Sequence, residues 1–385
     1  MKTKIITVFA TLLGAAVQAQ TMERALELVE ANNLELAAMR QETDAAKAAN
    51  AAERKMPDLE AEVAYLWPGR KDVSVSQTLD WATIGGQRRR TAAAKDSLAD
   101  IRYAAARQEV LLEAKLACIR LTHLNQLLRN RQERADMARQ MAQTARKRLA
   151  AGDARQADVN NAELAYATAR NQLARAQAEA DETLARLAAL NGSKPLEMTD
   201  TAYAPTPLPA RFDDWFPLVE GRLPQLLAAQ AEASEARHRQ AETRLEALPK
   251  LSVGFRGEFS EEEKYKGVAV GIGLPLWSGR ATRRSAAKAA RAAQAKQAAS
   301  RELTRASLEA AFVKTQTLGR IASEQRMTLE MTSNAPLLRK AVLAGETSAT
   351  EALMAMSLYF EAAEEALMAE RDYQEALARL TAATL

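Results

Sequence analysis

Two stretches of this chain have the patterning of single helices of unusual length. One covers residues 86–150 and the other residues 281–343. An α-helix rises about 1.5 Å per residue, so about 65 residues form a rod of roughly 97 Å. Helices in globular proteins average about 11–12 residues. The sequence therefore predicts a mainly helical fold that is not an ordinary globular domain.

Composition agrees with long helices and excludes several classes of function. The 385 residues are 48% hydrophobic but only 5% aromatic, and a single cysteine (Cys118) and two histidines (His123, His238) exclude a disulfide framework and a Cys/His metal cluster. A net charge of +4 without a basic block is not typical of a nucleic-acid-binding protein. Because no nucleophile–base arrangement or phosphate-binding loop is visible, we expect neither an enzyme nor a cofactor.

Residues 1–19 have the pattern of a secretory signal peptide. Lys2 and Lys4 give a positively charged start, residues 5–17 are largely apolar, and Ala19 ends a small-residue cleavage motif. The alternative is an uncleaved, buried helix. The apolar part is shorter than the about 20 residues of a membrane-spanning helix, and no later stretch has 18 consecutive apolar residues. If the chain enters a membrane, we do not expect it to do so as a helix.

The chain contains an internal duplication. Shifting the sequence by 193 residues places Gly152 on Gly345 and Tyr166 on Tyr359, and smaller changes of shift align further segments. A proline-rich stretch separates the halves and is unsuited to helix. We predict a first repeat over residues 20–190, a linker over residues 191–212 and a second repeat over residues 213–385.

Each repeat is predicted to contain a helix, a strand hairpin, a long helix and a short helix, in that order. The long helices end at glycines, which adopt the positive φ of a helix C-terminus without strain. The predicted elements are a helix over about 22–55, hairpins over 58–81 and 250–277, long helices over 86–150 and 281–343, and short helices over 156–190 and 348–383.

The two hairpins carry four segments of about ten residues in which apolar and polar side chains alternate. Leu59, Ala61, Val63 and Tyr65 alternate with polar or small residues in the first segment, and the other three follow the same pattern. Such segments are typical of transmembrane β-strands. Trp81 and Trp277, at the ends of the second strands, are candidates for an aromatic belt at the membrane surface. The alternative is a pair of amphipathic hairpins that pack on a soluble domain.

Four strands cannot close a barrel alone, because single-chain bacterial barrels have at least about eight. A sheet in lipid must close, since lipid offers no hydrogen bonds to a free edge. The barrel is therefore expected to be shared between chains: two copies give eight strands, and three give twelve with room for a lumen.

At this point the chain resembles a known family, the TolC-type outer-membrane efflux factors, and within it the compact heavy-metal-efflux (CzcC-like) and Bacteroidetes-type members. The resemblance rests on the duplicated order of elements, on the motifs at residues 149–159 and 343–353, and on the hairpin exit at residues 276–280. It implies a homotrimer with a shared 12-stranded β-barrel in outer-membrane lipid and a long α-helical barrel across the periplasm. It also implies a passive exit duct, fed by an inner-membrane pump, usually proton-driven and of the RND type, through a periplasmic adaptor.

The resemblance also implies roles for individual residues. The turns that contact the adaptor correspond to Gly152, Asp153, Gly345 and Glu346.

The pore entrance corresponds to Glu351 and to its first-half equivalent, Asp158. Three symmetry-related carboxylates attract cations and disfavour anions. The alternative for Glu351 is an acidic residue that stabilises the start of its own helix. Met354 and Met356 follow closely and suggest a soft-metal path, although helix packing explains them more simply.

Two other classes of protein remain open from the sequence. A periplasmic adaptor also contains a helical hairpin, but carries it once and lacks paired membrane strands. A structural coiled-coil protein of the envelope explains the long helices but not the strands, and it requires a sustained heptad pattern.

Overall fold

The computed structural model describes residues 21–67, 69–260, 264–275, 278–332, 340 and 349–385. These residues form two compact units. Unit 1 contains the described parts of residues 1–32, 114–205 and 320–375, and unit 2 contains those of residues 33–113, 206–319 and 376–385. The predicted signal peptide, Gly345, Glu346 and Trp277 lie outside the described residues.

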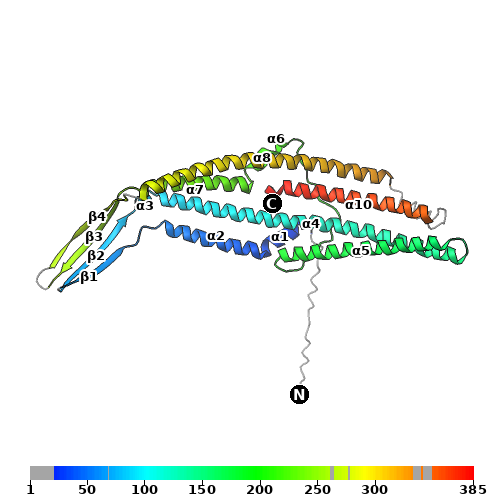
Figure 1. Cartoon of the computed structure of the whole chain (residues 1–385), viewed down its shortest axis with the longest axis horizontal. Coiled ribbons are helices and arrows are strands. Elements are labelled where there is room, and N and C mark those ends of the chain that lie inside the picture. Colours follow the sequence, from blue (N-terminus) through cyan, green and yellow to red (C-terminus); the bar gives the residue numbers. More distant parts are fainter. Residues whose placement is uncertain (1–20, 68, 261–263, 276–277, 333–339, 341–348) are drawn as a thin grey trace, which may run out of the picture. The chain divides into compact units, whose positions relative to one another are not determined.

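Unit 1 is a bundle of helices held together largely by small side chains. It contains α1 (Met22–Asn32), the later part of the 64-residue α4 (Gln87–Ala150), α5 (Gln156–Leu190) and parts of α8 (Ser278–Thr332) and α10 (Ala349–Leu380). α5 runs along α4 (Figure 1). One shared cluster contains Leu124, Leu127, Ala176 and Ala180, and a second contains Ala142, Ala145, Val159 and Ala162. Alanines at these positions let the two helix axes approach closely.

A larger apolar cluster in unit 1 joins α4, α5 and α10. Met137, Met141, Met356 and Phe360 are all buried in it, and Phe360 is only 1% exposed. Met354, two residues from Met356, is 76% exposed. The two methionines therefore have different environments, and Met356 serves the packing of the helices.

The first predicted helix, over about residues 22–55, is two helices in the structure. α1 ends at Asn32, and α2 (Leu34–Glu53) begins after Asn33. Asn33 has extended backbone angles, and its side-chain oxygen accepts a hydrogen bond of 2.9 Å from the Leu36 amide. Asparagine is a favoured N-cap because it satisfies an amide that has no partner within the helix. The apolar periodicity continues across this break, so periodicity alone did not reveal it.

Unit 2 combines a four-stranded antiparallel sheet with helices. The strands are β1 (Glu60–Leu66), β2 (Arg70–Leu79), β3 (Lys250–Phe259) and β4 (Lys264–Gly273), in the order β1-β2-β3-β4 (Figure 1). The helices are α2, α3 (Trp81–Ile84), α6 (Phe212–Glu220), α7 (Pro224–Glu246), the early parts of α4 and α8, and the end of α10, followed by a 3-10 turn (Ala382–Thr384).

Unit 2 has an aromatic core where α6 meets α8. Phe212, Trp215 and Phe216 of α6 pack on Phe312 of α8, with ring centroids 5.8 Å apart for both Phe212–Phe312 and Trp215–Phe312. The Arg305 guanidinium lies over the Phe212 and Phe216 rings, 5.9 and 5.6 Å from their centroids. This cluster fixes α6, which follows the proline-rich linker, against the long helix.

Unit 1 also contains a buried histidine. His123 of α4 is 3% exposed, and its Nδ1 has no hydrogen-bond partner among the described residues. Burial lowers its pKa to about 4 and the nearby Arg371 acts in the same direction, because both disfavour the charged imidazolium. His123 is therefore neutral and serves as a packing residue between helices.

This burial predicts a pH dependence of stability. The ordinary histidine pKa of 6.5 applies to the unfolded chain, so the unfolded state gains a proton at a higher pH than the folded state. Stability is then fully present above about pH 6.5 and falls toward pH 4, by up to about 3 kcal/mol. In His123→Gln, the midpoint of thermal unfolding is expected to change less with pH over this range than in the unmodified protein. In the control His238→Gln, the midpoint is expected to change with pH as it does in the unmodified protein. An unchanged slope in His123→Gln contradicts the assignment.

Candidate functional site: the strand sheet and the helical turns

The register of the four strands places most of the strands' apolar side chains on one face of the sheet. Side chains of directly paired residues lie on the same face, and successive residues alternate between faces. One row across the sheet contains Ala61, Val75, Phe255 and Val268, and the next contains Glu62, Ser74, Arg256 and Gly267. The apolar face is exposed in the single chain, with Val268 at 77% and Ile272 at 69%. An apolar surface of this kind requires a cover of lipid or protein.

Both edges of the sheet are without a neighbouring strand in the described part of the chain. β1 pairs only with β2, and β4 only with β3. The outer backbone groups of each edge strand are thus available to another strand.

Two glycines on the polar face lie very close to neighbouring residues. A Cβ at Gly254 would lie 2.4 Å from the Val75 carbonyl oxygen, and one at Gly271 would lie 2.5 Å from Ser252 Oγ. Any larger residue at these two positions forces the neighbouring backbone or side chain to move. Glycine is therefore required at these two positions of the polar face by close neighbours.

Two ion pairs on the polar face join the hairpins. Arg256 Nη2 of β3 lies 2.5 Å from Asp72 Oδ2 of β2, and Arg70 pairs with Glu258. The sequence did not predict these pairs, because they depend on the register between β2 and β3, which lie far apart in the chain. The only signal in the sequence was that the segments of β2 and β3 carry side chains of opposite charge.

Trp81 does not end a strand, as the sequence predicted, but begins helix α3. β2 ends at Leu79, and the Asp80 side chain accepts hydrogen bonds from the Ala82 amide (3.3 Å) and Thr83 Oγ1 (2.6 Å). This capping starts the helix at Trp81, the residue at which the strand was expected to end. Trp81 is 36% exposed, and its Nε1 donates a 2.6 Å hydrogen bond to the Pro249 carbonyl.

Sequence reasoning missed an aromatic residue at the opposite end of the sheet. Trp67, in the turn between β1 and β2, is 97% exposed, and Tyr65 beside it is 76% exposed. A tryptophan directly before a Pro-Gly turn was the available signal. Together with Trp81, these residues place aromatic side chains at both ends of the strands.

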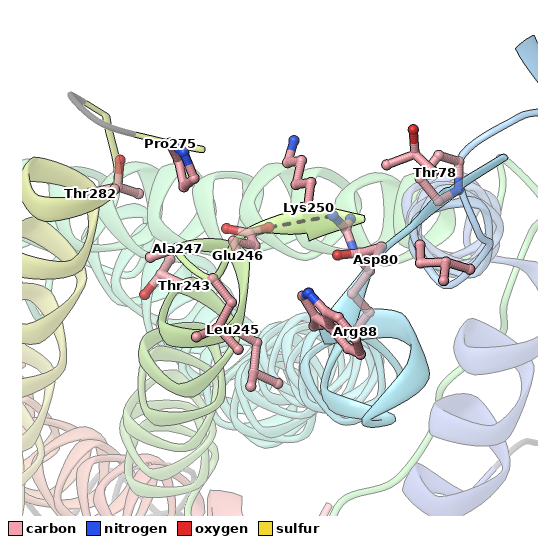
Figure 2. Close-up of a pocket in the computed structure, with 15 residues that line it drawn as sticks. Thr78, Asp80, Arg88, Thr243, Leu245, Glu246, Ala247, Lys250, Pro275 and Thr282 are labelled. Atoms are coloured by element: carbon pink, nitrogen blue, oxygen red, sulfur yellow. Dashed lines mark hydrogen bonds and ion pairs between the residues drawn. The ribbon is translucent and has the colours of Figure 1, made fainter. Parts of the chain in front are cut away.

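A cavity of about 260 Å³ lies in unit 2 where the strands meet the helices. The Arg88 guanidinium lies between two carboxylates there, 2.5 Å from Asp80 Oδ2 and 3.5 Å from Glu246 Oε1 (Figure 2). Burial raises the pKa of Asp80, but hydrogen bonds from Thr83 and Arg88 outweigh burial and hold that pKa below its ordinary value. This network fixes the start of α4 to the end of α7.

The turn after α4 is a Schellman motif centred on Gly152. The Asp153 amide donates to the Arg148 carbonyl (2.8 Å), and the Gly152 amide donates to the Leu149 carbonyl (3.0 Å). Gly152 has φ +81°, and a Cβ there would meet nothing within 4 Å. Conformation rather than space therefore requires glycine. Gly152 and Asp153 are both exposed.

Asp158 and Glu351 occupy equivalent positions in the first turns of α5 and α10. The Asp158 side chain accepts a 3.1 Å hydrogen bond from the Arg155 amide and so stabilises the start of α5. Glu351 is the third residue of α10 and is exposed. An acidic residue in the first turn stabilises a helix through the helix dipole, and this applies to both Asp158 and Glu351.

The described residues lack two features, an apolar membrane-spanning helix and a cluster of metal ligands. No helix there has an apolar stretch long enough to cross a bilayer. In the same ranges, no group of three or more His, Cys, Asp or Glu side chains is arranged to hold a metal ion.

Comparison with solved structures identifies the fold. The outer-membrane channel OprN has a TM-score of 0.76 at 18% identity, over 94% of this chain and 89% of its own. CusC, whose structures describe transmembrane channel formation, has a TM-score of 0.76 at 15% identity, over 95% and 92%. The Campylobacter jejuni CmeC outer membrane channel has a TM-score of 0.74 at 14% identity, over 94% and 85%.

This chain therefore has the fold of outer-membrane channels, and the resemblance to the TolC-type factors is confirmed at the level of the fold. No protein-family model matches the chain, and no curated protein sequence matches it. The coiled-coil and adaptor alternatives are not favoured, because the match covers nearly the whole chain, strands included.

The Gly152 turn yields a prediction with a matched control. Gly152→Ala places a side chain at φ +81°, which costs about 1–2 kcal/mol. Amide hydrogen exchange across residues 147–158 is expected to become about tenfold faster, since about 1.4 kcal/mol is a factor of ten. Gly221→Ala is the control, because its site is equally open but has φ −72°. Equal effects of the two changes contradict a conformational requirement at Gly152.

Proposed function

We propose that this protein is the outer-membrane exit duct of a tripartite efflux system and conducts substrates passively. Three copies associate, and their sheets close into one 12-stranded barrel. The single observation that carries the proposal is a four-stranded sheet with one apolar face, one polar face and two free edges, in a chain with the fold of outer-membrane channels.

The barrel follows from the requirements of lipid. Hydrogen-bonding groups on the edges of β1 and β4 need partners, and β4 of one copy can supply them to β1 of the next. The row that contains Val75 and Phe255 then contacts lipid, and the row that contains Ser74 and Arg256 lines an aqueous lumen. The aromatic residues Trp67 and Trp81 lie at the two ends of the strands, where interfacial aromatics are favoured.

The partners follow from the resemblance. An adaptor contacts the turns that contain Gly152 and Asp153, and an inner-membrane pump, proton-driven and of the RND type, supplies substrate and energy. The exposure of both residues and the rigid Schellman turn support a docking role. Gly345 and Glu346 are the equivalent candidates in the second repeat.

The strand edges provide the test of the shared barrel. With Val63→Cys in β1 and Val270→Cys in β4, a flexible bis-maleimide is expected to link chains into species of up to three copies. The native Cys118 does not interfere, because it is fully buried and burial raises the pKa of its thiol to about 12.

The matched control places both cysteines within one chain. Val75 and Phe255 are paired directly across β2 and β3, so Val75→Cys with Phe255→Cys is expected to give only internal links. Internal links alone in the edge variant, or species larger than three copies, contradict the closed trimer.

Glu351 is proposed to form a ring of three carboxylates at the entrance. Asp158, which accepts a hydrogen bond from the Arg155 amide, is proposed to lie at the same entrance. Glu351→Gln is expected to lower the cation-to-anion permeability ratio in planar bilayers and to weaken block by multivalent cations. Glu365→Gln, an exposed carboxylate further along α10, is the control. Unchanged selectivity in Glu351→Gln removes this residue from the pore.

A further inference from the structure

The overall charge balance of the chain hides a local asymmetry at the start of α8. Residues 278–301 contain seven Lys and Arg side chains, and the first acidic residue after them is Glu302. Four of the basic residues repeat at intervals of three or four, which places them within about 80° of one helical face. This basic stripe consists of Arg280, Arg284, Lys288 and Arg291, and all four are exposed.

Ion pairing along α8 changes with distance from the sheet. Further along the helix, Lys296 pairs with Glu232 (2.7 Å), Arg301 with Glu220 (2.6 Å) and Arg305 with Asp213 (3.0 Å). No ion pair is found for any member of the basic stripe among the described residues. The members of the basic stripe thus lie between the end of β4 and the ion-paired part of α8 in the sequence.

The acidic residues at the end of α7 are already engaged in ion pairs. The start of α8 packs on the end of α7, where a Cβ at Gly279 would lie 3.2 Å from Ala247 Cβ. Glu242 and Glu246 at this end of α7 pair with Arg239, at 2.8 and 3.6 Å, and Glu246 also faces Arg88 at 3.5 Å. These carboxylates therefore do not neutralise the stripe.

The other helix that leaves the sheet begins in the same way. Arg89 and Arg90 at the start of α4 are exposed, with no ion pair among the described residues. In the cavity between the two helix starts, the Lys250 ammonium points away from Asp80 and Glu246 (Figure 2). Like charges three or four residues apart destabilise a helix, and an external partner of negative charge would offset this repulsion.

We propose that the basic stripe binds the anionic headgroups of phospholipids at the membrane surface on the helical side of the sheet. The proposal rests on the proposed function, because it places β4 in lipid. β4 ends at Gly273, and the exposed apolar Leu274 follows (59%), so Arg280 lies only a few residues beyond the apolar face. Basic residues near an anionic surface attract its headgroups, and Trp81 provides an interfacial aromatic residue at the same end of the sheet.

The test compares lipid retention in two double variants. Arg284→Gln with Lys288→Gln removes two charges from the stripe, and the control Arg170→Gln with Arg175→Gln removes two exposed charges from α5. Each protein is reconstituted in phosphatidylcholine with phosphatidylglycerol, re-extracted, and analysed for retained lipid. The ratio of retained phosphatidylglycerol to phosphatidylcholine is expected to fall roughly tenfold in the stripe variant and to stay unchanged in the control.

Two further measurements keep the proposal falsifiable. In the unmodified protein, raising the salt concentration is expected to lower phosphatidylglycerol retention, because salt screens exposed charges. The charge-conserving variant Arg284→Lys with Lys288→Arg is expected to retain phosphatidylglycerol normally. If phosphatidylglycerol retention changes neither with salt concentration nor on removal of the two charges, the proposal is overturned.

The remaining outcomes separate this proposal from its alternatives. If the stripe variant changes ion selectivity in bilayers of phosphatidylcholine alone, the stripe lines the lumen and the lipid proposal is overturned. If its oligomer dissociates in both lipids, the stripe contacts a second copy, which also overturns it. If the unmodified protein forms normal channels but does not retain phosphatidylglycerol in preference to phosphatidylcholine, the lipid site is overturned and the proposed channel function stands. An unmodified protein that inserts into neither membrane contradicts the channel and this inference together.

Discussion

The architecture depends on the hydrogen-bonding requirement of β-strand edges. In the described part of the chain, β2 and β3 each have a neighbouring strand on both sides, but β1 and β4 each have one on a single side only. Each unpaired group costs several kcal/mol in hydrocarbon, whereas water satisfies it at little cost. The exposed apolar face of the same sheet makes water an unfavourable environment for it. A closed barrel built from several copies satisfies both constraints at once.

The helical part of the chain has a different requirement: its long helices must pack together without the large hydrophobic core of a globular domain. Unit 1 is built from small side chains and a few large ones such as Phe360, and unit 2 concentrates its aromatic residues where α6 meets α8. Alanine serves both helix propensity and close packing, so one residue type supports the extended helices and their contacts. Ionisable groups that become buried there, such as His123, remain neutral.

Much of the fold could be predicted from the sequence, because its strongest signals are periodic and local. Alternation indicated the strands, and the position of Gly152 indicated the end of α4, where φ is +81°. The capping residues Asn33 and Asp80 were harder to recognise, because asparagine and aspartate also occur within helices and loops; they divided one predicted helix and moved Trp81 out of its strand. The ion pairs between β2 and β3 could not be predicted without the register of strands far apart in the chain.

The functional residues were less accessible than the fold. Glu351 and Asp158 were identified by resemblance, and the structure shows that such residues also stabilise helix starts, so position alone does not separate the two roles. Trp67 and the basic stripe became apparent only once exposure and pairing were known.

The central claim is that three chains close one barrel in the outer membrane. The most direct measurement is the mass of the detergent-extracted particle after separation of the two membranes of the cell. The predicted result is a particle of three chains recovered with the outer membrane. A monomer or dimer recovered from the soluble periplasmic fraction would contradict it.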